Sequence, residues 1–252
     1  MKRRQWLRTS PWLALLACVA CTVSPQPLPP PVPTPVDVSI DIAGITLVPT
    51  GDERVTLRGA QGTVRVANRP PSAGKLDIVN LTTTSAAITL DVASDGSFEG
   101  TLPAHLVDEL RLQALVYETR SHSLDITGRE NGDSTEVTVP ARALGDCLTL
   151  TPAVDLDVGR VQLGQSREAT LHIDNACSSE VTVAGAELRF ADPTWQVATT
   201  LPVSVPQAGA LDIHFVFTPV DETNRREIVF LDLQTPGISG RRPITLLGQG
   251  KR

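Results

Sequence analysis

The chain has 252 residues and a mass of 26.9 kDa, enough for one large domain or two of about 100 residues each. Hydrophobic residues make up 41% and charged residues 20%, so a core can form and wholesale disorder is excluded. The 22 Lys and Arg against 28 Asp and Glu give a net charge of −6. Removing the four basic residues of the predicted signal leaves 18 against 28, or −10. Nucleic acid is therefore not expected as a partner, because phosphate binding needs a concentrated positive surface.

Residues 1–20 are predicted to be an export signal. Basic residues Lys2 to Arg4 precede a short apolar stretch, residues 12–20, which is typical of such signals. The stretch is too short to span a bilayer, which needs about 20 apolar residues. Arg3-Arg4 also resembles a twin-arginine export motif, although arginine pairs are common in any signal.

The end of this stretch, Ala20-Cys21, resembles the lipobox of bacterial lipoproteins, in which the cysteine thiol receives a diacylglycerol. The family usually has Leu three residues before the cysteine, where this chain has Cys18. Cys18 is the alternative attachment residue, with Leu15 in the usual place but a shorter apolar region. An ordinary secretory signal is a second alternative. Since Thr22 rather than Asp follows Cys21, the resemblance implies a lipid anchor in the outer membrane of a bacterial cell envelope.

Residues 21–37 are predicted to be a tether. Seven prolines fall between positions 25 and 35. Proline fixes φ and has no N–H, so this run favours extended polyproline II rather than helix or sheet. At about 3.1 Å per residue, the tether could hold a domain roughly 50 Å from the membrane. The alternative is a ligand for an aromatic-lined proline-binding groove.

Residues 38–143 are predicted to form a β-sandwich. Short runs with mostly alternating hydrophobicity indicate half-buried strands. Asp95-Gly96 predicts a hairpin turn between Val92 and Phe98, and residues 130–133 predict another. A helix-like run, residues 104–110, is too short to change the prediction of an all-β domain. The alternating runs are residues 63–66, 76–79, 87–92 and 110–116.

Three short motifs in this half, residues 79–83, 95–98 and 101–103, resemble the bacterial immunoglobulin-like domains of surface proteins. The resemblance covers residues 55–128. It implies an antiparallel sandwich.

Residues 146–250 carry a more specific resemblance, to the abnormal-spindle/hydin-type immunoglobulin-like domains that occur in bacterial envelopes as choice-of-anchor D modules. The chain departs from the family at Val158, where Phe is usual, and at Cys177, where Gly is usual. The family implies a seven-stranded antiparallel sandwich used for binding or scaffolding, with no catalytic residues to transfer. The matching motifs are residues 152–166, 169–175, 213–219 and 244–250.

The predicted fold class is therefore all-β, with two antiparallel immunoglobulin-like sandwiches in tandem after a signal peptide and a Pro-rich tether. The boundary between the sandwiches is expected near residues 141–145. Glycines at 159 and 164 predict turns on either side of a strand at 160–163. Residues 221–224 are predicted to be a polar hairpin loop before residues 228–231.

Two cysteines, Cys147 and Cys177, lie beyond the signal region. An even number of cysteines in an exported chain predicts a disulfide, because the compartment is oxidising. The loop it closes would stabilise the fold by about 3–4 kcal/mol. A metal site or reactive thiol has no support, because neither cysteine lies in a Cys-x-x-Cys motif.

No catalytic residue, metal site or cofactor is predicted. No pair of histidines has helical spacing, Ser166 lacks the second glycine of a nucleophile elbow, and no phosphate-binding loop is present. Surface or hydrogen-bonded roles are expected for all four histidines. They are His105, His122, His172 and His214.

Acidic pairs suggest a carbohydrate-cleaving site, but a solvated face is the favoured interpretation. The pairs are Asp155 with Asp157 and Asp108 with Glu109. Residues 130–133 could bind calcium weakly, although a plain turn explains them better. Asn80-Leu81-Thr82 matches a glycosylation sequon, which a bacterial lipoprotein is not expected to use.

These features predict a non-enzymatic envelope lipoprotein that binds an envelope protein through sandwich edges and loops. The first alternative is an exported carbohydrate-binding or adhesive protein, which would need an exposed aromatic platform. Trp195 is the only tryptophan after the signal, and Tyr117 is the only tyrosine. The second alternative is a hydrolase whose site lies between the two domains.

Overall fold

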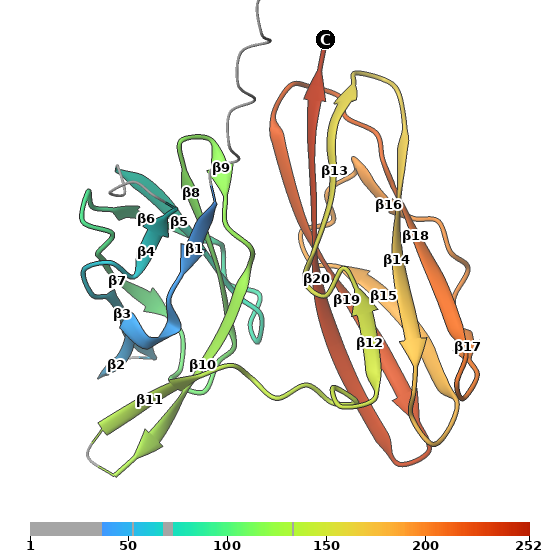
Figure 1. Ribbon diagram of the computed structural model, residues 1–252, viewed down its shortest axis with the longest axis horizontal. Coiled ribbons are helices and arrows are strands. Elements are labelled where there is room, and N and C mark those ends of the chain that lie inside the picture. The colour runs from blue at the N-terminus through green and yellow to red at the C-terminus, as the bar shows by residue number, and fades with distance from the viewer. Residues whose placement is uncertain (1–36, 52, 68–72, 133) are drawn as a thin grey trace, which may run out of the picture. The chain divides into compact units, whose positions relative to one another are not determined.

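The computed structural model describes residues 37–51, 53–67, 73–132 and 134–252 (Figure 1). These residues form strands and turns, apart from one short 3-10 helix, η1 (Ile42–Gly44). Within those ranges, no helix is long and apolar enough to span a membrane. The prediction of an all-β protein built from two sandwiches of mostly antiparallel strands is confirmed. The predicted signal, both candidate lipid-attachment cysteines and nearly all of the tether lie outside the described residues.

The first sandwich contains a six-stranded and a three-stranded sheet. The six-stranded sheet has the order β11 (Ser134–Thr138), β10 (Leu124–Asn131), β8 (Leu110–Val116), β5 (Gly74–Asn80), β6 (Ile88–Val92), with β9 (Thr119–Arg120) on β8. The three-stranded sheet has the order β2 (Ile45–Gly51), β3 (Arg54–Gly59), β7 (Phe98–Pro103), and β1 (Val38–Ile40) pairs separately with β4 (Val64–Val66).

Aliphatic side chains fill the space between these sheets, as expected for a chain with few aromatics. Leu57 of β3, Leu76 of β5 and Leu112 of β8 are fully buried members of this core. On one side, Thr135 Oγ1 of β11 donates a 2.6 Å hydrogen bond to the carbonyl of Leu47 in β2. The strand β11 therefore connects the margins of the two sheets.

The second sandwich contains a four-stranded and a five-stranded sheet. The four-stranded sheet has the order β12 (Leu148–Thr151), β14 (Arg167–Asn175), β18 (Ala210–Phe217), β16 (Trp195–Val197). The five-stranded sheet has the order β13 (Asp155–Gln162), β20 (Ile238–Lys251), β19 (Asn224–Thr235), β15 (Val181–Leu188), β17 (Val203–Val205).

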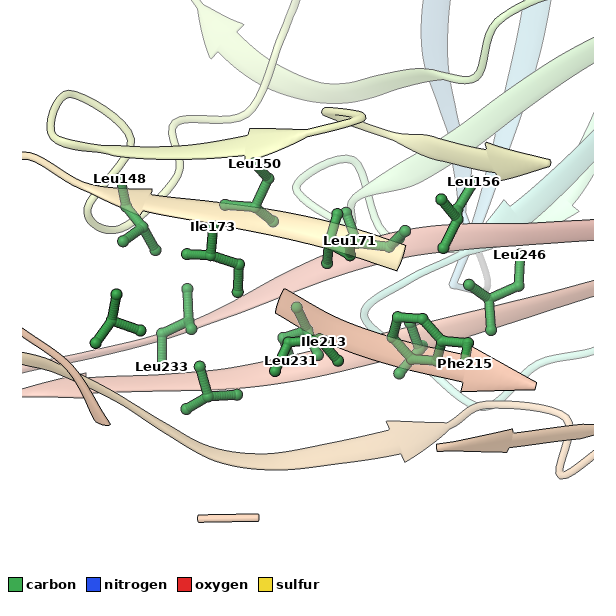
Figure 2. Packing of buried hydrophobic residues seen from close by; sticks show 14 of the residues in the cluster. Leu148, Leu150, Leu156, Leu171, Ile173, Ile213, Phe215, Leu231, Leu233 and Leu246 are labelled. Carbon is green, nitrogen blue, oxygen red and sulfur yellow. The ribbon is translucent and has the colours of Figure 1, made fainter. Parts of the chain in front are cut away.

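Alternate residues of these strands point into one core. Leu171 of β14, Ile213 of β18 and Leu231 of β19 belong to it (Figure 2). Trp195 is only 2% exposed, and its ring lies 4.7 Å from that of Phe217, measured between centroids. The tryptophan that could have formed an exposed aromatic platform is therefore part of the core.

The second sandwich differs from the seven-stranded antiparallel prediction in two ways. It has nine strands, and β13 runs parallel to β20. The register of this pair shifts between Asp157 and Arg160, and Gly159 lies there with φ of 65°. Gly159 therefore forms a β-bulge inside one continuous strand, where a turn was predicted. Gly164, with φ of 73°, does follow the end of that strand.

Two predicted hairpins are wrong in their pairing. The turn around Gly96 forms, with the Ala93 N–H bonded to the Ser97 carbonyl, but it joins β6 to β7, which lie in different sheets. Residues 221–224 likewise lead from β18 to β19, across the two layers. A polar turn sequence reverses the chain, but it does not decide whether the next strand pairs locally. The helix-like run at 104–110 is a turn followed by the start of β8.

The predicted disulfide is present between Cys147 and Cys177, with their Cα atoms 4.7 Å apart. It connects the start of β12 to the turn after β14. The backbone supports the same junction, because the Ala176 N–H donates to the Cys147 carbonyl at 2.8 Å. Asn175 is also buried there, and its amide donates to carbonyls of Ser179, Val205 and Pro206.

Candidate binding site

The two sandwiches meet through a buried arginine. The side chain of Arg111, in β8, is 3% exposed and forms two hydrogen bonds with Asp125, of 2.6 and 2.7 Å. The same guanidinium donates 2.9 Å bonds to the Thr245 hydroxyl and the Pro243 carbonyl, both in β20. A charge removed from water requires such partners, and Arg111 has them on both sides of the contact.

An apolar cluster lies beside this arginine. Val79 and Leu81 of the first sandwich pack with Ile228 and Phe230 of β19. In β19 the intervening residue Val229 points the other way, into the core of the second sandwich. The strand is therefore buried on both faces, which explains why its burial does not alternate.

The segment between the sandwiches is held to the first one. Arg142 forms ion pairs with Glu109 and Asp125 of the first sandwich. Two residues later, Leu144 packs against the second core. The chain therefore passes from contacts with the first sandwich to contacts with the second core within residues 142–144. We give the name junction to the contacts made by Arg111, Arg142 and the apolar cluster.

A cleft of about 800 Å³ lies next to the junction. Its floor consists of residues from β13, β19 and β20, and its wall is the hairpin formed by β8 and β9. A cavity of this size lies within the usual range for sites that bind small ligands. Most of the lining residues are polar or charged. The polar lining residues include Glu118, Arg120, Asp157, Arg160, Asn224 and Gln249.

The cleft also brings together His122 and Asp155, the combination that a hydrolase between the domains would need. The His122 Nδ1 atom lies 3.8 Å from Asp155 Oδ2, beyond hydrogen-bond distance, and the ring is 97% exposed. Asp155 instead accepts bonds of 2.7 and 2.6 Å from the Ser123 N–H and hydroxyl. Asp157 accepts a 2.7 Å bond from the Gly159 N–H. These carboxylates therefore hold backbone in place, and His122 is not oriented by either of them.

The wall of the cleft carries a strained turn. Tyr117 and Glu118 connect β8 to β9 with φ of 50° and 64°, both in the left-handed region. Two-residue hairpin turns of this kind favour Asn-Gly, because other residues with positive φ clash with their own backbone. Tyr117 is nevertheless 51% exposed and lies next to the cleft-lining residues Glu118 and Thr119. Strained residues of this kind cluster at functional sites.

The margins of the described sheets differ in how well they are protected. In the second sandwich, β12 is followed by Pro152, and β17 lies between Pro202 and Pro206. Arg167 covers the edge of β13 by donating a 2.7 Å bond to the Val158 carbonyl. In the first sandwich, β6 is a five-residue terminal strand that contains no proline. An edge of this kind presents unpaired backbone groups to another chain.

Two predicted surface histidines lie on the outer face of the four-stranded sheet. His172 bonds to Asp212 at 2.6 Å and to Asp174 at 3.2 Å, using both ring nitrogens. The bond to Asp212 raises the pKa of His172, and the charge of Asp174 adds to the effect. His214 pairs with Glu168 at 2.9 Å. Across the described part of the chain, no group of three or more His, Cys, Asp or Glu residues is arranged to hold a metal ion.

Most other candidate residues have structural roles. Asp108 is buried and accepts bonds from the Asn80 amide and the His105 N–H, so it stabilises the turn before β8. Asn80 is itself 5% exposed, which places the sequon nitrogen inside the fold. The Ser166 hydroxyl bonds to the Thr218 hydroxyl at 2.7 Å.

Residues 130–132 belong to the β10–β11 hairpin, and Asp133 lies outside the described residues. The remaining acidic candidate, Glu109, pairs with Arg142 in the junction.

Sequence reasoning missed the importance of Arg111 and Arg120. Arg111 occupies an outward position of an alternating strand, where charged residues are expected to face water, and Arg120 lies in the two-residue strand β9. The sequence marks the strained turn only by the end of the run 110–116, because no glycine or asparagine stands at or beside Tyr117-Glu118. The roles of these positions become clear only from their place beside the second sandwich, which bonds to Arg111 and shares the cleft with Arg120.

No protein-family model matches the chain, and no curated protein matches it. Solved structures similar to it include the ASH/PapD-like domain 7 of human CEP192 (11% identity, TM-score 0.34, 49% of this chain and 99% of that chain). A Porphyromonas gingivalis protein of unknown function has 13% identity and a TM-score of 0.35, over 86% of this chain and all of that one. The VesB protease of Vibrio cholerae has 11% identity and a TM-score of 0.38, over 69% and 62%. Likenesses of this size say nothing about function.

Proposed function

We propose that this protein is a non-enzymatic, lipid-anchored binding or scaffolding protein of the bacterial cell envelope. The observation that carries the proposal is the junction, in which Arg111 of the first sandwich bonds to Thr245 and Pro243 of the second. Because the two sandwiches share buried contacts, the loops and strand edges of both are presented in one fixed arrangement. Preorganised surfaces lose less entropy on binding.

The proposed attachment residue is Cys21, with Cys18 as the alternative. The support comes from the sequence, where the apolar stretch ends in Ala20-Cys21 and the Pro-rich residues follow. Thr22 after Cys21 is the feature behind the proposed outer-membrane location. The tether would keep the sandwiches away from the bilayer and leave their surfaces accessible.

The proposed surface for an envelope protein partner is the edge of β6. Its outward residues Thr89 and Asp91 are exposed, and its inward residue Val92 is buried. An extended segment of a partner could add to this edge through main-chain hydrogen bonds. The hydrolase alternative is less well supported, because His122 lies 3.8 Å from Asp155 and that carboxylate already accepts two bonds from Ser123.

The anchor is tested by intact mass of the protein recovered from membranes of a lipoprotein-competent bacterium. The expected mass corresponds to cleavage before Cys21 plus a diacylglyceryl group. Cys21→Ala should abolish the lipid, whereas the matched variant Cys18→Ala should retain it. The reverse result would assign the lipid to Cys18, and an unlipidated wild-type protein would overturn the anchor.

The binding role is tested with a photo-crosslinking amino acid at Thr89 of β6. A control carries the same group at Thr170, an exposed residue on the outer face of the four-stranded sheet. We expect a discrete crosslinked envelope protein from position 89 and none from position 170. Equal labelling from both positions, or none from either, would contradict recognition at this edge.

A further inference from the structure

The cleft has a balanced charge although the chain as a whole is acidic. Its lining contains three arginines and three carboxylates, while the full chain carries −6. The arginines are Arg120, Arg160 and Arg225, and the carboxylates are Glu118, Asp155 and Asp157. A ligand with a large charge of either sign would therefore meet repulsion as well as attraction.

The lining is also rich in groups that donate and accept hydrogen bonds. The side chains of Glu118 and Asn224 form no hydrogen bond to any other residue that the structure describes. Both can therefore bond to a ligand. Arg160 uses only its Nε atom, in a 3.0 Å bond to Gln249. Apart from glycines, Leu115 and Leu247 are the apolar members of the lining. A hydroxyl group both donates and accepts, so a polyhydroxylated ligand matches this mixture of groups.

The strained turn carries an aromatic residue, Tyr117, directly before the cleft-lining Glu118 in the sequence. Tyr117 is half-exposed and keeps φ of 50°, although Asn or Gly would occupy this position without strain. An aromatic ring offers an apolar face and a polar tip, which suits a ligand that is partly apolar and partly hydrated. The fold therefore retains an exposed aromatic, next in sequence to the cleft lining, against its local conformational preference.

We propose that the cleft between the two sandwiches binds a neutral oligosaccharide, with Tyr117 stacking on a sugar ring and Asn224 and Arg160 bonding to its hydroxyls. This inference rests on the proposed binding role but uses a site distinct from the β6 edge. A peptide fits less well, because side-chain recognition in clefts relies on apolar pockets and only two leucines line this one.

The test is isothermal titration of the detergent-solubilised full-length lipoprotein with maltohexaose, cellohexaose and chitohexaose. Binding of at least one of these probes is expected. Tyr117→Asn should weaken it by about 3- to 10-fold, because asparagine tolerates positive φ and removes only the ring. Asn224→Ala should weaken it as well. The matched control is Phe190→Leu, which changes an exposed aromatic outside the cleft and should leave binding unchanged.

The inference is overturned if none of the three probes binds, or if both cleft variants bind like the wild type. Tighter binding of hexagalacturonate than of the neutral probes would overturn the choice of a neutral ligand. Cleavage of a probe into shorter sugars would support the ligand class and contradict the non-enzymatic role. Loss of sugar binding with intact lipidation and crosslinking at Thr89 would remove this inference alone, whereas the converse pattern would remove the proposed function.

Discussion

The Arg111 guanidinium, in a strand of the first sandwich, donates a 2.9 Å hydrogen bond to the Thr245 hydroxyl, in the last strand of the second. This contact spans 134 residues of sequence and lies in the buried part of the junction. Arg111 is paired with Asp125 at the same time, so one side chain connects the cores of two sandwiches. Its removal should affect both.

Arg111→Ala is expected to lower the free energy of unfolding by about 3–5 kcal/mol, because it leaves the Asp125 carboxylate with one buried partner fewer. The measurement is urea denaturation followed by circular dichroism. Arg58→Ala is the matched control, since the Arg58–Glu99 pair is more than half exposed and should contribute less than about 1 kcal/mol. An effect of Arg111→Ala no larger than about 1 kcal/mol, the value expected for the control, would contradict a stabilising role for Arg111.

Replacing both Cys147 and Cys177 by Ala is expected to destabilise the protein by about 3–4 kcal/mol. The disulfide closes a loop with a sequence separation of 30, which restricts the unfolded chain. Thermal unfolding of the double variant should begin at a lower temperature, and adding a reductant to the wild type should produce a similar shift. A reductant that shifts the double variant equally would indicate another cause.

Asn175→Ala should destabilise the second sandwich by about 1–3 kcal/mol. The side chain is buried, donates to three carbonyls and accepts from the Cys177 N–H, and each of these groups would lose its partner. Chemical denaturation gives the value. Asn224→Ala, at an exposed position, is the control and should change stability by less than about 0.5 kcal/mol.

His172 should titrate above the usual histidine pKa of about 6.5, because Asp212 and Asp174 favour its charged form. Its contribution to stability is therefore complete below the unfolded pKa and is lost as pH rises through the higher folded pKa. Two-dimensional NMR of the imidazole gives the midpoint. Asp212→Asn should lower that midpoint, and an unchanged midpoint would show that the bond does not hold the proton.

Changing Tyr117-Glu118 to Asn-Gly should stabilise the protein by about 1–2 kcal/mol. Both positions have positive φ, and the new residues adopt it with less strain. The unfolding temperature should rise by a measurable amount. A fall in stability would mean that the contacts of the Tyr117 and Glu118 side chains outweigh the strain of their backbone.

Local physics alone determined much of this protein. Alternating hydrophobicity predicted β8 at its observed limits, residues 110–116, because one face of that strand must enter a core whatever the rest of the chain does. The paired cysteines were equally readable, since an exported chain with two cysteines oxidises them. The sequence also predicts the signal, the lipid-bearing Cys21 and the tether, which remain predictions.

Tertiary structure determined which outward faces of the strands are buried and which strands pair. Arg111 and Gln113 alternate with buried residues of β8, a pattern typical of a solvated face, yet both are buried. Likewise, the turn around Gly96 is local, but whether β7 pairs with β6 depends on which sheet it joins. The first outcome depends on contacts more than 100 positions apart, such as Arg111 with Thr245, and the second depends on the pairing of β7 with β3. The period of the hydrophobic residues indicates which face of a strand is buried within its own sandwich. It contains no information about a second domain that covers the other face.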